Sequence, residues 1–398
     1  MNTSSEDPLD GRRPIRIGIA GFGTAARSFV PAIQAHPGFE LVTVAEPVQA
    51  VRDEIIRDHG IRSHESIAEM LADPRLDAVY IATPTERHWE HVQQAMAAGK
   101  HVLVEKPMAA KIEHAKAMVA AAEAAGIVFM VGHSHSYDLP IQRMREIITG
   151  GTLGRVRMAN IWCYTDWMYR PRRPDELDAS LGGGVTYRQG SHQFDVLRLL
   201  CGGMVRSVKA KTFDWDVDRR GIGAHVVFLE FADGAAATAV YNGYGGFSTM
   251  DLAFNINEGG FQVPRESRRW ARRTFVGRSA QDELLAKRER AKSTGLTRGA
   301  NQPFFGITLV SCERGDIRQS PQGLFVYTEE GQTEITLPND RSPRDLVMAE
   351  FHDAVIGKSP ALHDGRWGLA NLEVCESAIA SSASGREVML AHQVAARQ

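Results

Sequence analysis

This sequence has few cysteines, no long apolar run and almost no net charge. Its four cysteines, Cys163, Cys201, Cys312 and Cys375, form no Cys-x-x-Cys pair. That spacing argues against a disulfide framework or a zinc site and favours reduced thiols in the cytoplasm. No apolar run approaches the ~20 residues of a membrane-spanning helix, so no membrane partner is expected. A formal net charge of −2 excludes the strong positive field typical of nucleic-acid-binding proteins.

The length and the apolar content are sufficient for two domains. The chain has 398 residues, of which 43% are hydrophobic. The first residues, MNTSSEDPLDGRRP, are polar and contain no apolar segment of a secretory signal. We therefore expect a disordered lead over residues 1–13, a first domain over 14–138, a second domain over 139–364, and a C-terminal helix within 365–398 that packs back on the core.

A glycine turn follows the first apolar stretch, IRIGIA. Gly21, Gly23 and Ala26 form Gly-x-Gly-x-x-Ala, the pattern of a dinucleotide-binding turn. Gly21 permits the tight turn, Gly23 lets backbone approach a pyrophosphate, and Ala26 allows the helix to pack closely on the strand. The start of the following helix attracts the phosphate charge. The residues that we expect at the cofactor in this turn are Gly21, Phe22, Gly23, Thr24 and Ala25.

A second strand, ELVTVAEP, ends in Glu46, about 20 residues beyond the glycine turn. An acid at this place hydrogen-bonds the ribose hydroxyls of the adenosine. Its negative charge repels a 2′-phosphate, so Glu46 favours NAD over NADP. The alternative is that Glu46 is only an acid at the end of a strand.

The remainder of the first domain alternates helical and strand patterns. This alternation predicts an α/β fold with a parallel sheet wrapped by helices. Ligands bind outside the carboxyl ends of such strands, where several polar residues follow the predicted strands. The residues that we expect at the cofactor here are Thr83, Pro84, His88, Glu105 and Lys106.

The pattern changes after residue 154. GRVRMANIWCYT, VRSVKAKTFDW and AHVVFLEFADGAAATAVYNGYG read as successive strands, and ADGA is typical of a hairpin turn. More strands follow from FFGITLVSCERG onward. The second domain is therefore predicted to be an α/β domain with a large, mostly antiparallel open sheet.

The stretch IATPTERHWEHVQQAMAAGKHVLVEKPM resembles the central signature of the Gfo/Idh/MocA oxidoreductases. The glycine turn, Glu46, the EKP motif, the region of His192 and the closing RWGLANLEVCESAIASSASGREV occur in the order of that family. The resemblance implies a Rossmann domain joined to a domain with a large open sheet. It also implies a homodimer or homotetramer formed through that sheet, with a small molecule as the substrate.

The segment GGGVTYRQGSHQFDVLRLL carries the expected acid–base chemistry. The resemblance makes His192 the general acid/base and lets Lys106 donate hydrogen bonds to the substrate oxygen. A neutral imidazole near pH 7 can take a hydroxyl proton while hydride leaves for nicotinamide. Asp195 lies on the next helical turn, where it either tunes the site or is only a charge near the start of the helix.

Arg188 departs from the family pattern, which usually has an aspartate four residues before the histidine. Arginine stays protonated and cannot act as a base, but it can clamp a carboxylate through two parallel hydrogen bonds. The replacement, followed by Gln189, indicates an anionic substrate. The alternative is an arginine that bridges carboxylates of the protein itself.

The stretch GHSHSYDLP places His133 and His135 two residues apart, on one face of a predicted strand. No third ligand is evident, so we expect no metal site. The resemblance places this segment toward nicotinamide and substrate. Tyr164 and Trp167 can form the walls of a site for a flat ring.

The segment from residue 263 to 298 is strongly basic, within an insertion predicted at about 259–300. It contains eleven Lys and Arg against four Asp and Glu, a net charge of +7, so the rest of the chain carries −9. The favoured interpretation is a solvated helical insertion at an oligomer interface. The alternative is binding of nucleic acid or of an acidic partner.

These observations predict an NAD-dependent dehydrogenase that oxidises a secondary alcohol. GGGVTYRQGSHQFDVLRLLCGG and FFGITLVSCERGDIRQSP are most similar to dihydroxyphthalate-type dehydrogenases of the family. That resemblance implies oxidation of a carboxylated cis-dihydrodiol to an aromatic diol. The alternatives are a sugar or inositol dehydrogenase and a non-catalytic NAD-binding sensor.

Overall fold

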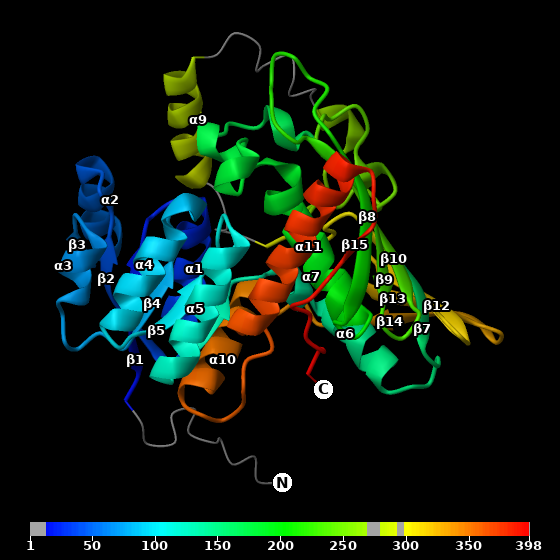
Figure 1. The fold of residues 1–398 in the computed structure, drawn as a ribbon, viewed down its shortest axis with the longest axis horizontal. Helices are drawn as coiled ribbons and strands as arrows, with labels where there is room; N and C mark the ends of the chain where they lie inside the picture. The colour runs from blue at the N-terminus through cyan, green and yellow to red at the C-terminus, as the bar shows by residue number, and fades with distance from the viewer. Residues whose placement is uncertain (1–12, 269–278, 293–297, 398) are drawn as a thin grey trace.

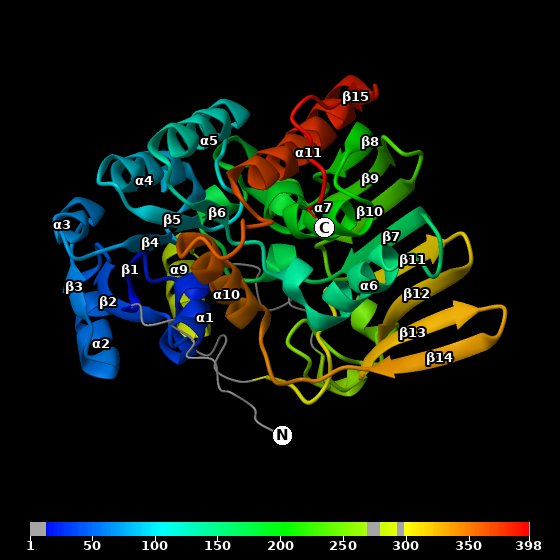
Figure 2. The same cartoon turned by 90° about the horizontal axis from the view of Figure 1, so that it is seen from below.

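A computed structural model describes residues 13–268, 279–292 and 298–397. The lead that the sequence predicts over residues 1–13 lies outside the described residues except for Arg13. No helix in the described ranges is long and apolar enough to cross a membrane. Figures 1 and 2 show two lobes, each built on its own sheet, with helices packed between them.

The first lobe is a six-stranded parallel sheet in the order β3-β2-β1-β4-β5-β6. This order confirms the predicted dinucleotide-binding fold. Its buried apolar strands are bounded by polar turns, as the alternating pattern predicts. Its elements are β1 (Ile15–Ala20), α1 (Thr24–Ala35), β2 (Phe39–Ala45), α2 (Gln49–His59), β3 (Arg62–His64), α3 (Ile67–Leu71), β4 (Ala78–Ile81), α4 (Thr85–Ala97), β5 (His101–Val104), α5 (Ile112–Ala125) and β6 (Phe129–Val131).

The second lobe is a nine-stranded sheet in the order β14-β13-β12-β11-β7-β10-β9-β8-β15. Strands β7 and β10 pair in parallel, and the other described neighbours pair antiparallel, so the mostly antiparallel sheet is confirmed. The strands are β7 (Val156–Tyr164), β8 (Val205–Phe213), β9 (Ala224–Phe231), β10 (Ala236–Asn242), β11 (Ile307–Cys312), β12 (Gly315–Ser320), β13 (Gly323–Thr328), β14 (Gly331–Thr336) and β15 (Val388–Met389).

Within the described ranges, five α-helices accompany this sheet or join it to the first lobe. Helix α11 packs against α5 and β6 of the first lobe and against α7 and β8 of the second, while α10 packs on α1. One apolar core therefore continues from Met108 and Val131 through Trp367 to Leu197 and Val227. The helices are α6 (Leu139–Thr149), α7 (Ser191–Leu200), α9 (Ala280–Lys292), α10 (Pro343–Val355) and α11 (Gly365–Ser384).

The basic insertion contains α9, which stands beside α1 rather than away from the molecule (Figure 1). Glu283 of α9 pairs with Arg219 at a buried site, and Lys287 pairs with Glu176. Most side chains of α9 are exposed, as expected of a solvated insertion, but ion pairs through Glu283 and Lys287 hold one face of the helix against the second lobe. The rest of that prediction falls partly on residues 269–278 and 293–297, which lie outside the described residues.

Candidate active site

The glycine turn after β1 has the shape that a pyrophosphate needs. Gly21 has φ of +84°, and a Cβ there would lie 3.0 Å from Ala82 O and from Thr83 Cγ2. A Cβ on Gly23 would meet nothing within 4 Å, so the space over this residue is open. Helix α1 then begins with no side-chain cap and no acid in its first turn. The first backbone amides of α1 therefore have no side-chain partner at the start of the helix and can bind an anion.

Glu46 is fixed at the end of β2 by the backbone of two loops. Its Oε2 accepts a hydrogen bond from Phe22 N and its Oε1 accepts one from Val48 N, each at 3.0 Å. Each carboxylate oxygen keeps a further lone pair for a ribose hydroxyl. The open glycine turn and this oriented carboxylate fit the pyrophosphate and the ribose of NAD.

His88 joins the loops that follow β4 and β5. Its Nδ1 lies 2.9 Å from Pro107 O, and its Nε2 lies 2.9 Å from Thr83 O. Burial lowers the pKa of His88 to about 4, so the ring is neutral at pH 7. Pro84 directly precedes α4 between these contacts. A neutral ring carries a single N–H, so His88 donates a hydrogen bond to one of these two carbonyl oxygens and only contacts the other, at the edge of the sheet.

Lys106 follows β5 and reaches across to the second lobe. Its Nζ donates to Arg188 O at 2.8 Å. Burial lowers the pKa of Lys106 to about 8, although the neighbouring Glu105 carboxylate acts in the opposite direction. Glu105 itself accepts a hydrogen bond from Tyr80 OH at 2.6 Å beneath the edge of the sheet. Lys106 is thus an ammonium group at neutral pH with little water around it.

His192 lies in the first turn of α7 and is 5% exposed. Its ring stands edge-on to His135 and Phe305, with centroid separations of 4.6 and 5.3 Å. Burial and then the charge of Lys106 hold the pKa of His192 well below its usual value. Its buried Nδ1 has no hydrogen-bond partner among the described residues. A neutral imidazole and an ammonium group therefore lie close enough for the charge of Lys106 to act on His192.

Arg188 lies in a π-helical turn, Thr186–Gly190, immediately before α7. Its Nη2 is 3.8 Å from Asp175 Oδ2, beyond hydrogen-bond distance. Among the described residues, its buried Nε and Nη2 atoms find no hydrogen-bond acceptor. The next residue, Gln189, accepts a long hydrogen bond from Tyr241 OH at 3.4 Å. Arg188 is thus a buried cation with unused donors beside Lys106.

The two histidines after β6 do not share a strand face, so that prediction is wrong. Strand β6 ends at Val131, and His135 begins a short 3₁₀ helix. Gly132 N still donates to Val104 O of β5 at 2.7 Å, but His133 N turns back to Val131 O at 2.8 Å, so the chain leaves the strand before His135. His135 stacks on Phe305, with 4.1 Å between ring centroids, and its Nδ1 lies 3.1 Å from Asp138 Oδ2. His133 instead faces Asp195, with 3.9 Å between Nδ1 and Oδ2.

Asp195 belongs to a buried charge cluster rather than to an open site. Its Oδ1 accepts a hydrogen bond from Trp367 Nε1 at 2.7 Å and lies 3.5 Å from His363 Nε2. His363 Nδ1 lies 3.5 Å from Glu350 Oε1. Burial disfavours charge on all three groups, but Asp195 and Glu350 together raise the pKa of His363 to about 9. The cluster joins α7 to α10 and to the start of α11.

This cluster predicts a pH-dependent stability. Because the folded-state pKa of His363 is raised from 6.5 to about 9, its stabilising effect is complete below about pH 6.5 and is lost as pH rises to about 9. We expect the unfolding free energy to fall by on the order of 1–3 kcal/mol over that range. Urea unfolding of the wild type and of His363→Gln checks this. If the unfolding free energies of the wild type and of His363→Gln change with pH in parallel, His363 contributes nothing to the pH dependence.

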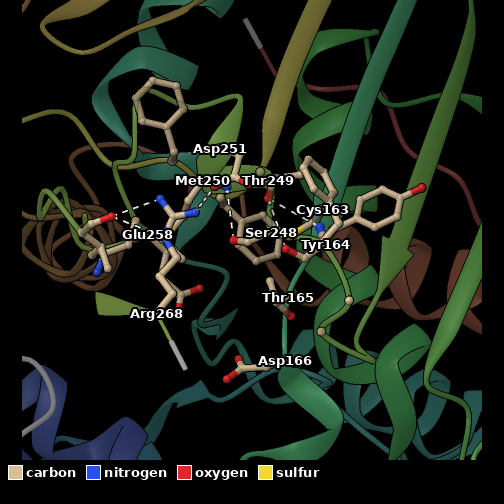
Figure 3. Close-up of a pocket in the computed structure, with 18 of the residues that line it drawn as sticks. Cys163, Tyr164, Thr165, Asp166, Ser248, Thr249, Met250, Asp251, Glu258 and Arg268 are labelled. Carbon is tan, nitrogen blue, oxygen red and sulfur yellow. Dashed lines mark hydrogen bonds and ion pairs between the residues drawn. The ribbon is translucent and has the colours of Figure 1, made fainter. Parts of the chain in front are cut away.

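A cavity of about 650 Å³ is lined in part by Phe305, whose ring also contacts His135 and His192. Figure 3 shows Tyr164, Thr249 and Glu258 among the residues around this cavity. Tyr164 lies in its wall, and its ring meets Phe247 edge-on. Trp167 is not in the wall. It is 1% exposed, and the guanidinium of Arg172 covers its ring at 4.0 Å.

Sequence reasoning missed several of the residues around this cavity. Phe305 directly precedes Gly306 and β11, and no local pattern separates it from any other apolar residue near a strand. Arg265, Arg268 and Arg290 come from the basic insertion. The signal available for them was the run of positive charge, which we interpreted as solvated. Among the described residues, no group of three or more His, Cys, Asp or Glu is arranged to hold a metal ion.

Comparison with known proteins identifies the family of the chain. An oxidoreductase family with an NAD-binding Rossmann fold matches residues 15–133, and the Gfo/Idh/MocA C-terminal domain matches residues 141–256. The chain belongs to the Gfo/Idh/MocA oxidoreductase family. It is accordingly an NAD-dependent dehydrogenase, and the turn at Gly21 and Gly23 with Glu46 fits that cofactor.

Two full-length relatives support this membership. A 1-carboxy-3-chloro-3,4-dihydroxycyclohexa-1,5-diene dehydrogenase of Comamonas testosteroni is 36% identical over 377 residues, which cover 91% of this chain and 93% of that protein. A crystal structure from Bordetella bronchiseptica RB50 has a TM-score of 0.88 and 38% identity, covering 95% of this chain and all of that one.

A more distant structure shares the fold alone. The WlbA dehydrogenase of Bordetella pertussis, solved with NADH and UDP-GlcNAcA, has a TM-score of 0.72 and 21% identity. The match covers 95% of this chain and 99% of that one. The two-lobed arrangement is therefore shared by dehydrogenases that differ widely in sequence.

Proposed function

We propose that this dehydrogenase oxidises a carboxylated cis-dihydrodiol to an aromatic diol. The observation that carries the proposal is Arg188, a buried arginine with unused donors next to Lys106 and His192. The hydroxyl oxygens of a neutral sugar can accept hydrogen bonds from such a cation but do not balance its charge, whereas a carboxylate matches it in both charge and geometry. The name of the Comamonas relative, which specifies a carboxylated cyclohexadiene diol, supports the same substrate class.

In this proposal, Lys106 and His192 act on one carbinol of the substrate. The Lys106 ammonium donates a hydrogen bond to the hydroxyl oxygen and stabilises the negative charge that develops there. His192, neutral because of burial, accepts the hydroxyl proton. NAD held by the turn at Gly21 and Gly23 and by Glu46 would supply the acceptor for the hydride of the carbinol carbon.

The immediate product is a ring ketone with NADH and one proton on His192. Loss of the C–H proton from the second carbinol carbon and protonation of the ketone oxygen turn this ketone into the aromatic diol. Aromatisation makes the reaction strongly favourable in this direction. The arginine at position 188, where the family usually has an aspartate, orients the carboxylate and takes no part in proton transfer.

A substrate panel tests the proposal. The purified protein with NAD is offered a carboxylated cis-dihydrodiol, the same diol without its carboxylate, inositol and an aldonic acid, and NADH absorbance is followed. We expect the carboxylated diol to give the highest kcat/KM. A preference for inositol or for the sugar acid would replace the proposal with a polyol dehydrogenase. No NADH from any compound would support a non-catalytic sensor.

The proposal extends to assembly and location. One face of the large sheet exposes Met158, Trp162, Val226 and Phe228 by 43–48%, a clear apolar patch on paired strands. We propose that this face binds a second copy of the chain, and sedimentation as a monomer would contradict this. The four cysteines are free, which suits the reducing cytoplasm where we place the protein.

A further inference from the structure

The proposed reaction removes two protons from the diol, and His192 can hold only one of them at a time. The first is the hydroxyl proton that leaves during hydride transfer. The second is the C–H proton of the neighbouring carbinol carbon, which must leave before the ring ketone becomes an aromatic diol. An imidazole that already holds the first proton is no longer a base. The reaction therefore calls for a second group that accepts a proton.

His135 lies directly beside His192. Its ring stands edge-on to the ring of His192 with 4.6 Å between centroids, and it stacks on Phe305 of the cavity wall at 4.1 Å. The side chain of His135 is 18% exposed, so water has little access to it. This ring is therefore next to both the cavity and the imidazole that takes the first proton.

The carboxylate of Asp138 fixes which nitrogen of His135 carries the proton. His135 Nδ1 lies 3.1 Å from Asp138 Oδ2, and the Asp138 side chain is 2% exposed. A carboxylate only accepts hydrogen bonds, so Nδ1 carries the proton and Nε2 keeps its lone pair. In the described ranges, no residue forms a hydrogen bond with this Nε2. His135 thus has a free, oriented proton-accepting nitrogen.

Asp138 makes this contact instead of capping a helix. It directly precedes α6, where an aspartate commonly accepts a hydrogen bond from an amide of the first turn, but its side chain caps no amide there. Burial raises the pKa of Asp138, and the charge of His135 acts in the opposite direction. The buried carboxylate and a protonated His135 therefore stabilise each other, as the acid and the histidine of a catalytic triad do.

Three other groups near the site are less suited to accept the second proton. Lys106 is an ammonium group at neutral pH, because its pKa is about 8. Burial lowers the pKa of His133 to about 4, which makes it a weak base. Burial raises the pKa of Glu258, but the charge of Arg170 outweighs this and lowers it, so Glu258 is also a weak base. His135, which a carboxylate orients, is the best-placed base among these groups.

We propose that His135 is a second catalytic base, whose Nε2 accepts the C–H proton of the second carbinol carbon while Asp138 holds its ring. This inference rests on the proposed function. In this step the C–H bond breaks and its electron pair forms a C=C bond to the carbonyl carbon. The carbonyl oxygen takes the proton that His192 received during hydride transfer. His192 is then neutral again, and His135 passes the second proton to water after the aromatic diol leaves.

Single turnovers with the full-length protein in excess separate the two steps. A carboxylated cis-dihydrodiol is mixed with the protein and NAD, and stopped-flow absorbance follows NADH and the aromatic diol. In the wild type, we expect both to appear together. His135→Gln should form NADH at the wild-type rate but the aromatic diol at least about tenfold more slowly. The matched control, His114→Gln, changes a histidine that stacks on Trp89 of the first lobe and should show no lag.

Three results of this experiment would overturn the inference. If the aromatic diol appears together with NADH in His135→Gln, no second base is needed. If NADH and the diol are slowed equally, His135 only positions the site. Asp138→Asn removes the negative charge beside His135 and should also delay the diol, so wild-type kinetics in this variant would contradict the pair.

A measurement without hydride transfer separates this inference from the proposed function. A carboxylated cyclohexanone, which offers no carbinol to oxidise, is incubated with the protein and NAD in D₂O, and NMR follows exchange of the hydrogens beside its ketone. We expect exchange with the wild type and none above background with His135→Gln. If exchange depends on His135 but no carboxylated diol gives NADH, the second base stands and the proposed reaction fails. If the wild type and His135→Gln exchange equally, or neither does, His135 is not the base.

Discussion

Replacing His192 with alanine is expected to lower kcat by roughly 10²-fold or more and to leave NAD affinity unchanged. The imidazole is the proton acceptor, and its loss removes the base that the structure places closest to the charge of Lys106. Lys106 cannot replace it while protonated, because its pKa of about 8 keeps the ammonium form at neutral pH. The glycine turn and Glu46 lie in the other lobe, so cofactor binding should not change. Initial rates with saturating NAD, together with NAD titration, measure both quantities.

A matched histidine controls for general damage to the fold. His114 stacks on Trp89 with 5.0 Å between ring centroids, between α5 and α4 on the outside of the first lobe. His114→Ala should keep wild-type kcat. If His192→Ala instead loses NAD affinity and turnover together, or unfolds at a much lower temperature, His192 is a structural residue of α7. If kcat of His192→Ala stays within a few fold of the wild-type value, His192 is not the proton acceptor.

Replacing Arg188 with alanine is expected to lower kcat/KM for a carboxylated diol by about 30-fold or more, because truncating one partner of a buried charge pair costs at least ~2 kcal/mol. The same diol without its carboxylate should lose little, since it never contacts the guanidinium. Arg188→Lys keeps the charge but not the two parallel donors. Its kcat/KM for the carboxylated diol should therefore lie between the values of the wild type and of Arg188→Ala. Steady-state kinetics give kcat/KM of each variant for the two diols, and the ratio of these two values measures the preference for the carboxylate.

Equal losses on both diols would contradict the carboxylate clamp. That result would favour the alternative in which Arg188 only bridges acids of the protein, with Asp175 at 3.8 Å as its nearest partner. Arg173 provides a control, because its Nη2 atom lies 2.7 Å from Oδ2 of the same Asp175. Arg173→Ala should affect both diols alike and only weakly.

The first lobe could be predicted from the sequence because its signals are local. Gly21 and Gly23 are required by a turn of a few residues, and the alternation of strands and helices sets the parallel sheet. The polar residues at strand ends, such as Lys106, follow from the same topology, since parallel strands end at one edge. The family resemblance added His192, which the local pattern alone does not separate from a structural histidine.

The rest of the site depends on contacts between distant parts of the chain. His363 reaches Asp195 only because α11 packs across both lobes, and nothing near His363 in the sequence indicates this contact. The same is true of Phe305, which meets His135 only in the folded structure. Charge patterning showed that residues 263–298 are basic but could not show that buried ion pairs turn α9 toward the cavity.

The transfer of deuterium from substrate to NAD tests whether this protein oxidises a carboxylated cis-dihydrodiol by hydride transfer. A carboxylated cis-dihydrodiol carrying deuterium at its carbinol carbons is incubated with NAD and the purified protein, and both products are analysed by mass spectrometry. Hydride transfer from the carbinol carbon should give NADH with one deuterium per molecule, formed together with an equal amount of aromatic diol. NADH without deuterium, or an aromatic diol formed without NADH, would contradict hydride transfer from the carbinol and with it the proposed function.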